Sequence, residues 1–273
     1  MRKHIKRILA AALPSVVKPV IAEAPAKPVM TLAPERAAIV APTIAVVNRS
    51  RVLTDSEIAP VVAAIQIQVD RDFAPAWGMP ANLVFVPSTH QPEPTAWVVQ
   101  LLDTSDEKGA LGYHDMTNAD LPVAKIFAKD DQKYGLSWSV TLSHEVLEMI
   151  ADPFVDTTVF VQDGETTGNL VAFEMCDAVE SDSFGYKIND VLVSNFVLPA
   201  FFERNRAPKS TKFDFRGILV APLSIAKEGY LSIFPVNPAT KGWTQQQGSQ
   251  QIGARFASKN PLTSRKAKRG FKG

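Results

Sequence analysis

The sequence predicts an α+β domain with a loop-rich C-terminal part, and three observations support this class. Hydrophobic residues make up 46% of the 273 residues, which is enough to fill a sizeable core. Short apolar runs with strand character are interspersed with two helical patterns in the first half of the chain. No apolar run approaches the length of a membrane span, and a single cysteine excludes an internal disulfide.

The first predicted elements are a strand, a helix and three further strands. Ile44–Val47 is an apolar run of strand length. Apolar residues then recur at helical spacing from Ile58 to Phe73, and Thr54 with Glu57, or Ser56 alone, can cap the start of this helix. The strands predicted after it are Leu83–Val86, Ala96–Leu102 and Val123–Ala128.

A loop and then a second helix complete the predicted core. The loop contains Gly109 and the sequence Gly112-Tyr113-His114-Asp115, which is rich in turn-forming residues. The second helix is predicted over Ser137–Ala151 and is stopped by Asp152-Pro153. Beyond it the chain is expected to be loop-rich, with short apolar runs at Val193–Val197, Gly217–Val220 and Leu231–Phe234.

The charge distribution divides the chain into three parts. Residues 1–42 contain 7 basic and 2 acidic residues, and residues 241–273 contain 8 basic residues and no acidic one. The domain predicted over 43–240 therefore carries 14 basic and 26 acidic residues. We expect a basic Pro/Ala-rich arm and a basic flexible tail, whose partners would be nucleic acid, a membrane surface, or neighbouring subunits. No transmembrane segment is expected.

The N-terminal arm leaves the location of the protein open. Its basic start and short apolar run resemble a secretory signal with a cleavage site near Ala22-Glu23-Ala24. However, Pro14, Lys18 and Pro19 interrupt the apolar run, which favours an uncleaved arm. We therefore expect a cytoplasmic or virion-associated protein, with secretion as the alternative if residues 1–24 are removed.

The second helix carries a narrow stripe of ionisable groups on an otherwise apolar surface. At about 100° per residue, His144, Glu148, Thr141, Asp152 and Glu145 fall within a sector of roughly 100°, and the other directions are apolar. A solvated helix would show Lys or Arg on a broad polar face. Buried ionisable groups are costly without a partner, so this stripe predicts one.

A bound cation is the partner that the surrounding sequence favours. Between Tyr134 and Tyr186 there are ten acidic residues and no Lys or Arg. One His with carboxylates suits zinc or a similar divalent ion, whereas carboxylates alone would suit calcium, as would Asp163-Gly164-Glu165 with Asn169. The competing interpretation is a buried His hydrogen-bonded to one Glu, with the other acids solvated.

The spacing defines the candidate ligands. His144 and Glu148 are four residues apart, as are the two histidines of an HExxH metal-binding helix. Here Glu148 replaces the second histidine, so the motif is HExxE, and Glu145 is the candidate general base. The third ligand is expected from Glu174 or Asp177, and the sequence does not decide between them. The other acid would orient a ligand.

These motifs resemble a known group of proteins. The element order resembles the zincin fold of metallopeptidases. The two motif blocks are similar to an HExxE motif of the plant Exordium-like proteins and of uncharacterised bacterial and phage proteins. They read Ser143-His144-Glu145-x-x-Glu148-x-x-x-Asp152-Pro153 and Glu174-x-x-Asp177. The resemblance covers about residues 43–235. It implies a zincin-like mixed sheet, whose edge strand holds the substrate, and it assigns that place to Val123–Ala128.

Two functions from different classes follow. The first is a zinc-dependent hydrolase, most simply a peptidase acting on a peptide or protein, in which Glu145 moves a proton from water to the leaving amine. Tyr113, His114 and Tyr186 are candidates for stabilising the oxyanion, and Asp152 is a candidate for supporting the site. The second is a non-catalytic structural or assembly protein, such as a phage virion component, that retains the fold.

Overall fold

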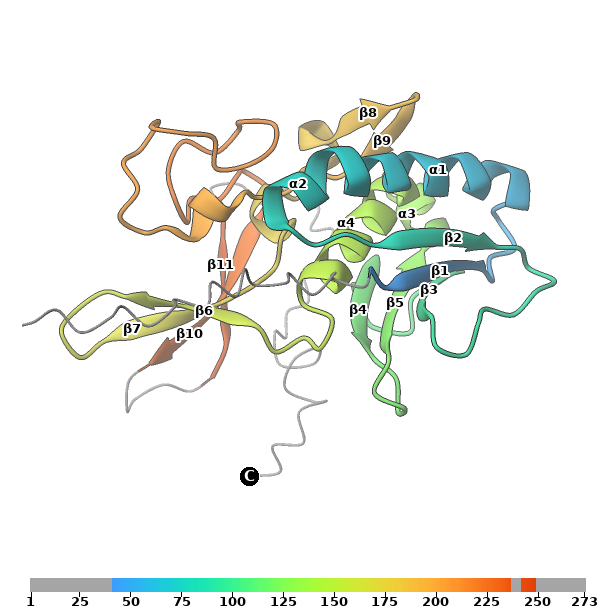
Figure 1. Ribbon diagram of the computed structural model, residues 1–273, viewed down its shortest axis with the longest axis horizontal. Helices are drawn as coiled ribbons and strands as arrows, with labels where there is room; N and C mark the ends of the chain where they lie inside the picture. Colours follow the sequence, from blue (N-terminus) through green and yellow to red (C-terminus); the bar gives the residue numbers. More distant parts are fainter. Residues whose placement is uncertain (1–40, 237–241, 249–273) are drawn as a thin grey trace, which may run out of the picture. The chain divides into compact units, whose positions relative to one another are not determined.

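The computed structural model describes residues 41–236 and 242–248 (Figure 1). Most of the predicted N-terminal arm, including the alternative signal segment, and the predicted tail beyond residue 248 lie outside these residues. Within the described part, no helix combines the length and the apolar character that crossing a bilayer requires.

The strands from the first half of the described chain form a five-stranded mixed sheet. Strands β2, β1, β3 and β5 are parallel in that order, and β4 lies antiparallel to β5 at the edge. A second, four-stranded sheet is antiparallel and lies later in the sequence, so the predicted α+β class is confirmed. The strands of the first sheet are β1 (Thr43–Asn48), β2 (Asn82–Val86), β3 (Trp97–Leu102), β4 (Gly112–Met116) and β5 (Pro122–Phe127).

The edge strand differs from the prediction in two ways. The segment predicted as a loop, Gly112–Asp115, forms β4, whose backbone is held in register by β5. The predicted edge strand Val123–Ala128 instead forms β5, an internal strand between β3 and β4. Gly and Asp favour turns locally, but pairing with a neighbouring strand overrides that preference, and no local pattern reveals the partner.

The first helical segment lies between β1 and β2. Its helix α1 (Asp55–Ile67) starts with the predicted capping box, in which the Thr54 side chain accepts from the Glu57 backbone N–H and the Glu57 carboxylate accepts from the Thr54 N–H. The predicted helix continues to Phe73 as a π-helical turn and ends in the short helix α2 (Ala74–Trp77), where Gly78 adopts a left-handed conformation.

Helix α4 (Trp138–Ala151) confirms the second predicted helix and is buried almost throughout. A short helix, α3 (Ala128–Lys133), was not predicted and leads into it. Helices α1 and α4 share one core with the face of the sheet that carries Ile44, Val46 and Val99 (Figure 1). Burial on all sides explains why α4 carries no Lys or Arg.

The C-terminal part contains more strand than predicted. Only one of the three apolar runs, Leu231–Phe234, lies in a strand along its whole length, whereas Gly217–Val220 forms irregular chain outside any strand. Thr244–Gln247, in the predicted flexible tail, forms a strand paired with β10. The elements here are β6 (Thr158–Gln162), β7 (Gly168–Ala172), β8 (Tyr186–Ile188), β9 (Val191–Val193), β10 (Tyr230–Val236), β11 (Thr244–Gln247) and the 3₁₀ turns η2 (Asp177–Val179), η3 (Asp182–Phe184) and η4 (Pro199–Phe202).

Candidate metal centre

Helix α4 provides three ionisable side chains to one buried cluster. His144, Glu145 and Glu148 are each only 3% exposed. The Nε2 atom of His144 lies 3.2 Å from Oε2 of Glu148, one helical turn further along. The helix is fixed in place at its start, where the Asp182 carboxylate accepts from the Ser137 N–H, and at its end, where Asp152 caps the chain.

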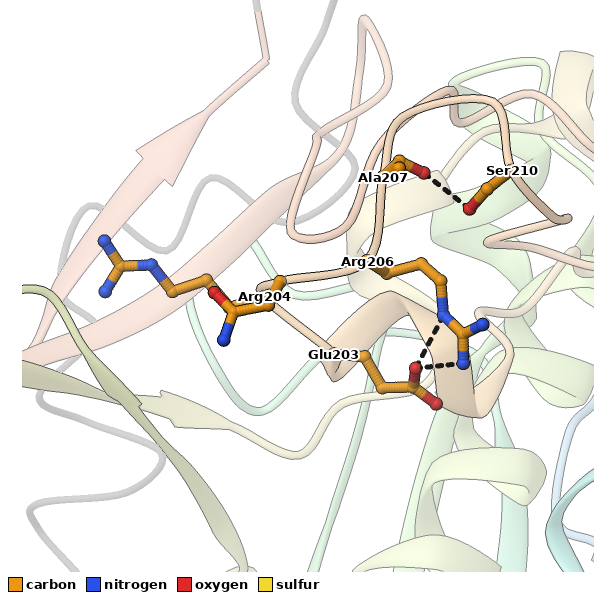
Figure 2. A pocket seen from close by; sticks show the side chains of 6 residues that line it. Glu203, Arg204, Arg206, Ala207 and Ser210 are labelled. Atoms are coloured by element: carbon orange, nitrogen blue, oxygen red, sulfur yellow. Dashed lines mark hydrogen bonds and ion pairs between the residues drawn. The ribbon is translucent and has the colours of Figure 1, made fainter.

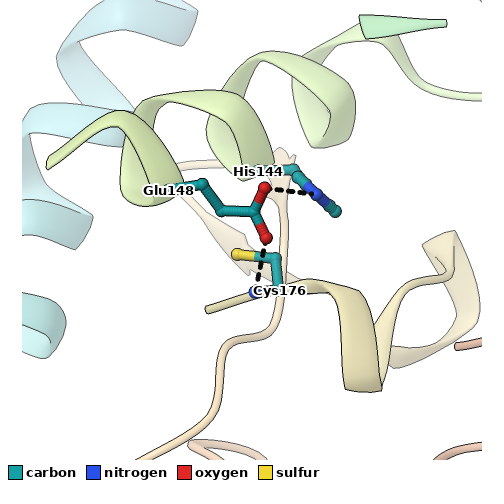
Figure 3. A group of neighbouring side chains, drawn as sticks. All are labelled: His144, Glu148 and Cys176. Carbon is teal, nitrogen blue, oxygen red and sulfur yellow. Dashed lines mark hydrogen bonds and ion pairs between the residues drawn. The ribbon is translucent and has the colours of Figure 1, made fainter. Parts of the chain in front are cut away.

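The chain between β7 and η2 brings further donor groups beneath this face of α4. Oδ1 of Asp177 lies 3.3 Å from Nε2 of His144, and the Cys176 backbone N–H donates to Oε1 of Glu148 at 3.0 Å. Figure 3 shows Glu148 on α4 between His144 and Cys176. Gly229 packs on the Asp177–Ala178 peptide so closely that a Cβ there would lie 2.5 Å from the Ala178 carbonyl oxygen. The chain carrying Asp177 is therefore held by backbone contacts.

Edge strand β4 contributes His114 from the opposite side of the cluster. His114 pairs with Ala124 of β5, whose side chain belongs to the core under the helices, so the alternation of the strand turns His114 toward α4. Its Nδ1 lies 3.2 Å from Oε2 of Glu145, and its Nε2 lies 3.9 Å from Oε2 of Glu174. The structure thus brings both candidate third ligands to the cluster, Asp177 beside His144 and Glu174 beside His114.

Charges within the cluster are poorly balanced. Among the described residues, the ion-pair partners of Glu145, Glu148 and Asp177 are histidines and never Lys or Arg. Burial opposes a charge on His144, but Glu148 and Asp177 outweigh it and raise the pKa of the imidazole well above its usual value. Burial and the nearby Glu148 raise the pKa of Asp177 to about 7. Without a cation, the cluster retains protons that exposed groups would lose.

Nε2 of His144 lies close to two carboxylates at once. A charge-assisted N–H···O bond spans about 2.7–2.9 Å, and one imidazole N–H cannot point at two carboxylates equally. Ligand atoms about 2.0–2.1 Å from a tetrahedral ion lie roughly 3.3–3.4 Å from each other. Nε2 of His144 lies 3.2 Å from Glu148 and 3.3 Å from Asp177, close to this spacing, whereas the group around His144 whose three donor atoms all lie within 4.8 Å of one another consists of His144, Glu148 and Cys176. His144 and Glu148 could therefore hold a divalent cation together, with Asp177 or Cys176 as the third ligand.

Cys176 is a weaker candidate ligand than Asp177. Its thiol is buried and close enough to His144 and Glu148 to share an ion with them. Burial raises the pKa of this thiol far above its usual value. Because only the thiolate binds metal well, the surrounding carboxylates favour Asp177 as the third ligand. Cys176 is a small buried residue whose backbone N–H positions Glu148.

Three predicted site residues lie apart from the cluster. Tyr113 alternates with His114, so its hydroxyl lies on the opposite face of β4 and donates to Asp106 at 2.9 Å. The Tyr186 hydroxyl donates to Asp72 and accepts from Gln68, both in the π-helical turn Gln68–Phe73 that follows α1. Asp152 accepts from the N–H groups of Asp156 and Thr157, which makes it a cap for the end of α4.

The alternative calcium site has the geometry of a turn. Asp163 and Gly164 lie in the hairpin that joins β6 to β7, where the Asn169 amide donates to the Asp163 carboxylate at 2.9 Å. The contact to Asp163 is made by the amide nitrogen of Asn169, whereas the amide oxygen is the atom that would bind calcium. This hydrogen bond accounts for the relative positions of Asp163 and Asn169, and calcium binding by this hairpin stays a prediction.

Tyr230 is a site residue that sequence reasoning missed. It is half-buried at the start of β10, and its hydroxyl is hydrogen-bonded to Asp177. Burial and the negative charges of Asp177 and Glu180 raise its pKa well above the usual value, so the hydroxyl stays protonated and donates. The sequence around Tyr230 is an ordinary apolar strand, and no motif distinguishes this tyrosine.

A separate pocket of about 590 Å³ lies on the surface around η4 (Figure 2). An ion pair between Glu203 and Arg206 forms part of its wall, and Arg204 extends away from it. None of the predicted site residues lines it; the lining residues are Glu203, Arg204, Asn205, Arg206, Ala207 and Ser210. The ionisable cluster under α4 is therefore the stronger candidate for chemistry.

Comparisons of the chain with family models, with curated proteins and with solved structures found no match.

Proposed function

We propose that this protein is a metal-dependent hydrolase, most simply a zinc peptidase, built around the HExxE helix. The observation that carries the proposal is the position of Nε2 of His144, 3.2 Å from Glu148 and 3.3 Å from Asp177 inside the protein. These three residues would hold the ion. A divalent ion supplies a Lewis acid that polarises a carbonyl and lowers the pKa of water.

Glu145 is the residue best suited to move the proton. It follows His144 on the helix and stands outside the set around His144, with its carboxylate 3.2 Å from Nδ1 of His114. A carboxylate in that position accepts a proton from the attacking water and returns it to the leaving amine. His114 orients this carboxylate, which is a different role from the oxyanion contact expected from the sequence.

The substrate is best placed beside β4. This strand is the outer strand of its sheet and directs His114 toward Glu145, and a peptide in extended conformation binds along such strands. The place that the zincin resemblance assigned to Val123–Ala128 thus passes to Gly112–Met116, because β5 is internal.

The test combines metal content with peptide cleavage. We expect the purified chain to contain zinc, His144→Ala to lose it, and His90→Ala, a substitution of an exposed loop histidine, to retain it. Glu145→Gln should keep the metal and lose cleavage of a peptide mixture. Equal cleavage by the wild type and Glu145→Gln would show that Glu145 is not the general base. A wild-type protein without bound metal would refute the proposal.

A structural metal site in a non-catalytic protein is the second candidate, and the burial of the cluster favours it. His114, His144, Glu145, Glu148, Glu174 and Asp177 are all at most 9% exposed, and structural metal sites are closed whereas catalytic sites keep a position open for water or substrate. Under this alternative, metal content and stability depend on His144, and no peptide is cleaved at any metal loading.

A further inference from the structure

We infer that the cluster binds two divalent cations, with Glu148 shared between them. This inference rests on the proposed metal site at His144 and adds a second one around His114. Two groups of donor atoms, each within 4.8 Å of one another, include Glu148: one consists of His144, Glu148 and Cys176, and the other of His114, Glu148 and Glu174. The two groups have only Glu148 in common.

The geometry of Glu148 suits a bridging carboxylate. Its Oε2 lies 3.2 Å from Nε2 of His144 and 3.8 Å from the nearer His114 nitrogen, Nδ1, which is the ring nitrogen on the Glu145 side, so Glu148 lies between the two imidazoles. Its Oε1 is held by the Cys176 N–H at 3.0 Å, which fixes the orientation of the carboxylate. In two-metal sites the ions lie about 3.5–4 Å apart, a separation that one shared carboxylate can span.

The two ring nitrogens of His114 have different surroundings, as expected for a metal ligand. Nδ1 lies 3.2 Å from Glu145, so that carboxylate can accept an N–H from it. Nε2 then presents its lone pair on the side of Glu174, whose Oε2 lies 3.9 Å away. A histidine that donates one N–H to a carboxylate and binds metal through its other nitrogen is the usual arrangement at metal centres.

The charge of the cluster favours two ions over one. Four carboxylates surround the two histidines, namely Glu145, Glu148, Glu174 and Asp177, and together they carry a charge of −4 when the imidazoles are neutral. One divalent ion leaves −2 inside the protein, and two bring the sum to zero. Two divalent ions therefore match the formal charge of these four carboxylates.

Counting the ions bound to the folded chain tests the inference. The full-length protein is stripped with a chelator, reloaded with Zn²⁺ and examined by native mass spectrometry, and Co²⁺ loading with electron paramagnetic resonance detects magnetic coupling between ions. We expect two ions per chain and coupled Co²⁺ in the wild type and in the control His90→Ala. His114→Ala and Glu174→Gln should each bind one ion, with no coupling.

Each outcome distinguishes this inference from the proposed function. One ion in the wild type, lost in His144→Ala, would overturn the two-ion centre and leave the proposed metal site intact. No ion in the wild type would overturn both. Two ions retained by both His114→Ala and Glu174→Gln would place the second ion elsewhere and overturn the assignment. Glu174→Gln keeps the shape of the side chain, so it remains a valid test if His114→Ala does not fold.

Discussion

Gly112 is the position where a single added methyl group should disturb the candidate base. It lies at the start of β4, directly against α4. A Cβ at this position would lie 2.8 Å from Cγ2 of Thr141, 2.9 Å from Oε1 of Glu145 and 3.0 Å from Cγ of Glu145. Both neighbours are buried side chains of the same helix, so neither can swing into solvent. Gly112→Ala must therefore move the strand, the helix or the Glu145 carboxylate.

The size of the effect follows from these contacts. Forcing an extra methyl group into a packed interior costs about 1–3 kcal/mol. Gly112 is not in a left-handed conformation, so alanine can adopt the same backbone. Replacing Gly by Ala then stabilises the folded protein by about 0.4–1 kcal/mol, because it reduces the conformational entropy of the unfolded chain. The net loss is about 1–2 kcal/mol, which lowers the melting temperature of a domain of this size by roughly 2–8 °C.

A double-mutant cycle measured by urea unfolding shows whether Glu145 is the contact responsible. In the Glu145→Ala background, two of the three close contacts disappear, so Gly112→Ala should cost clearly less than in the wild type. Gly164→Ala is the control, because its close contact is the hydroxyl end of the Thr167 side chain in an exposed turn. A Gly112→Ala variant as stable as the wild type, or costs that are strictly additive, would refute the packing argument.

Three further predictions concern protons, the tyrosine and the helix cap. The pKa values of Asp177 and His144 are raised, so the metal-free protein binds protons on folding. Its melting temperature should fall as pH rises from about 4 to 7 through Asp177 and continue to fall above about 6.5 through His144, whereas the stabilisation by added Zn²⁺ should grow over the same range. A Zn²⁺-dependent shift that is constant with pH would contradict this. Tyr230→Phe removes a hydrogen bond to Asp177 and should weaken Zn²⁺ binding about 10–100-fold by competition with a chromogenic chelator, with the circular dichroism spectrum unchanged. Thr54→Ala breaks the capping box of α1 and should cost about 1 kcal/mol in urea unfolding without altering Zn²⁺ binding; an equal loss of binding would mean that α1 and the site are coupled.

Local patterns predicted the two long helices, α1 and α4, but not the short helix α3, because a long helix is encoded by neighbouring residues. The capping box at Thr54 and the stop at Asp152-Pro153 depend on residues within one or two turns. Strands such as β4 and β11 escaped prediction because their sequences, Gly112–Met116 and Thr244–Gln247, are polar or rich in turn-forming residues. Their extended conformation comes from pairing with β5 and β10, and these partners are set by the topology of the chain.

The site was predictable in so far as it lies on one helix. The i, i+4 spacing of His144 and Glu148 put both on one face, and the run of acids without Lys or Arg indicated that Glu174 and Asp177 would lie near them. Tyr113 and Tyr186 were selected for their chemistry alone, and alternation along β4 turned Tyr113 to the other face. His114 reached the cluster through the same alternation, which a loop prediction could not show.

The position of the cluster argues that an ion would also hold the fold together. Its donors come from three segments that are distant in sequence: β4, α4 and the chain between β7 and η2. Among the described residues, the ion pairs linking α4 to Asp177 and to His114 involve only histidines and carboxylates, so in the absence of metal this junction depends on protons retained by His144 and Asp177. Such pairs weaken when those protons leave, whereas a divalent ion binds the deprotonated groups more strongly. The same donors that would activate water would therefore also join the first sheet to the C-terminal part, and such an ion would account for the acids buried there.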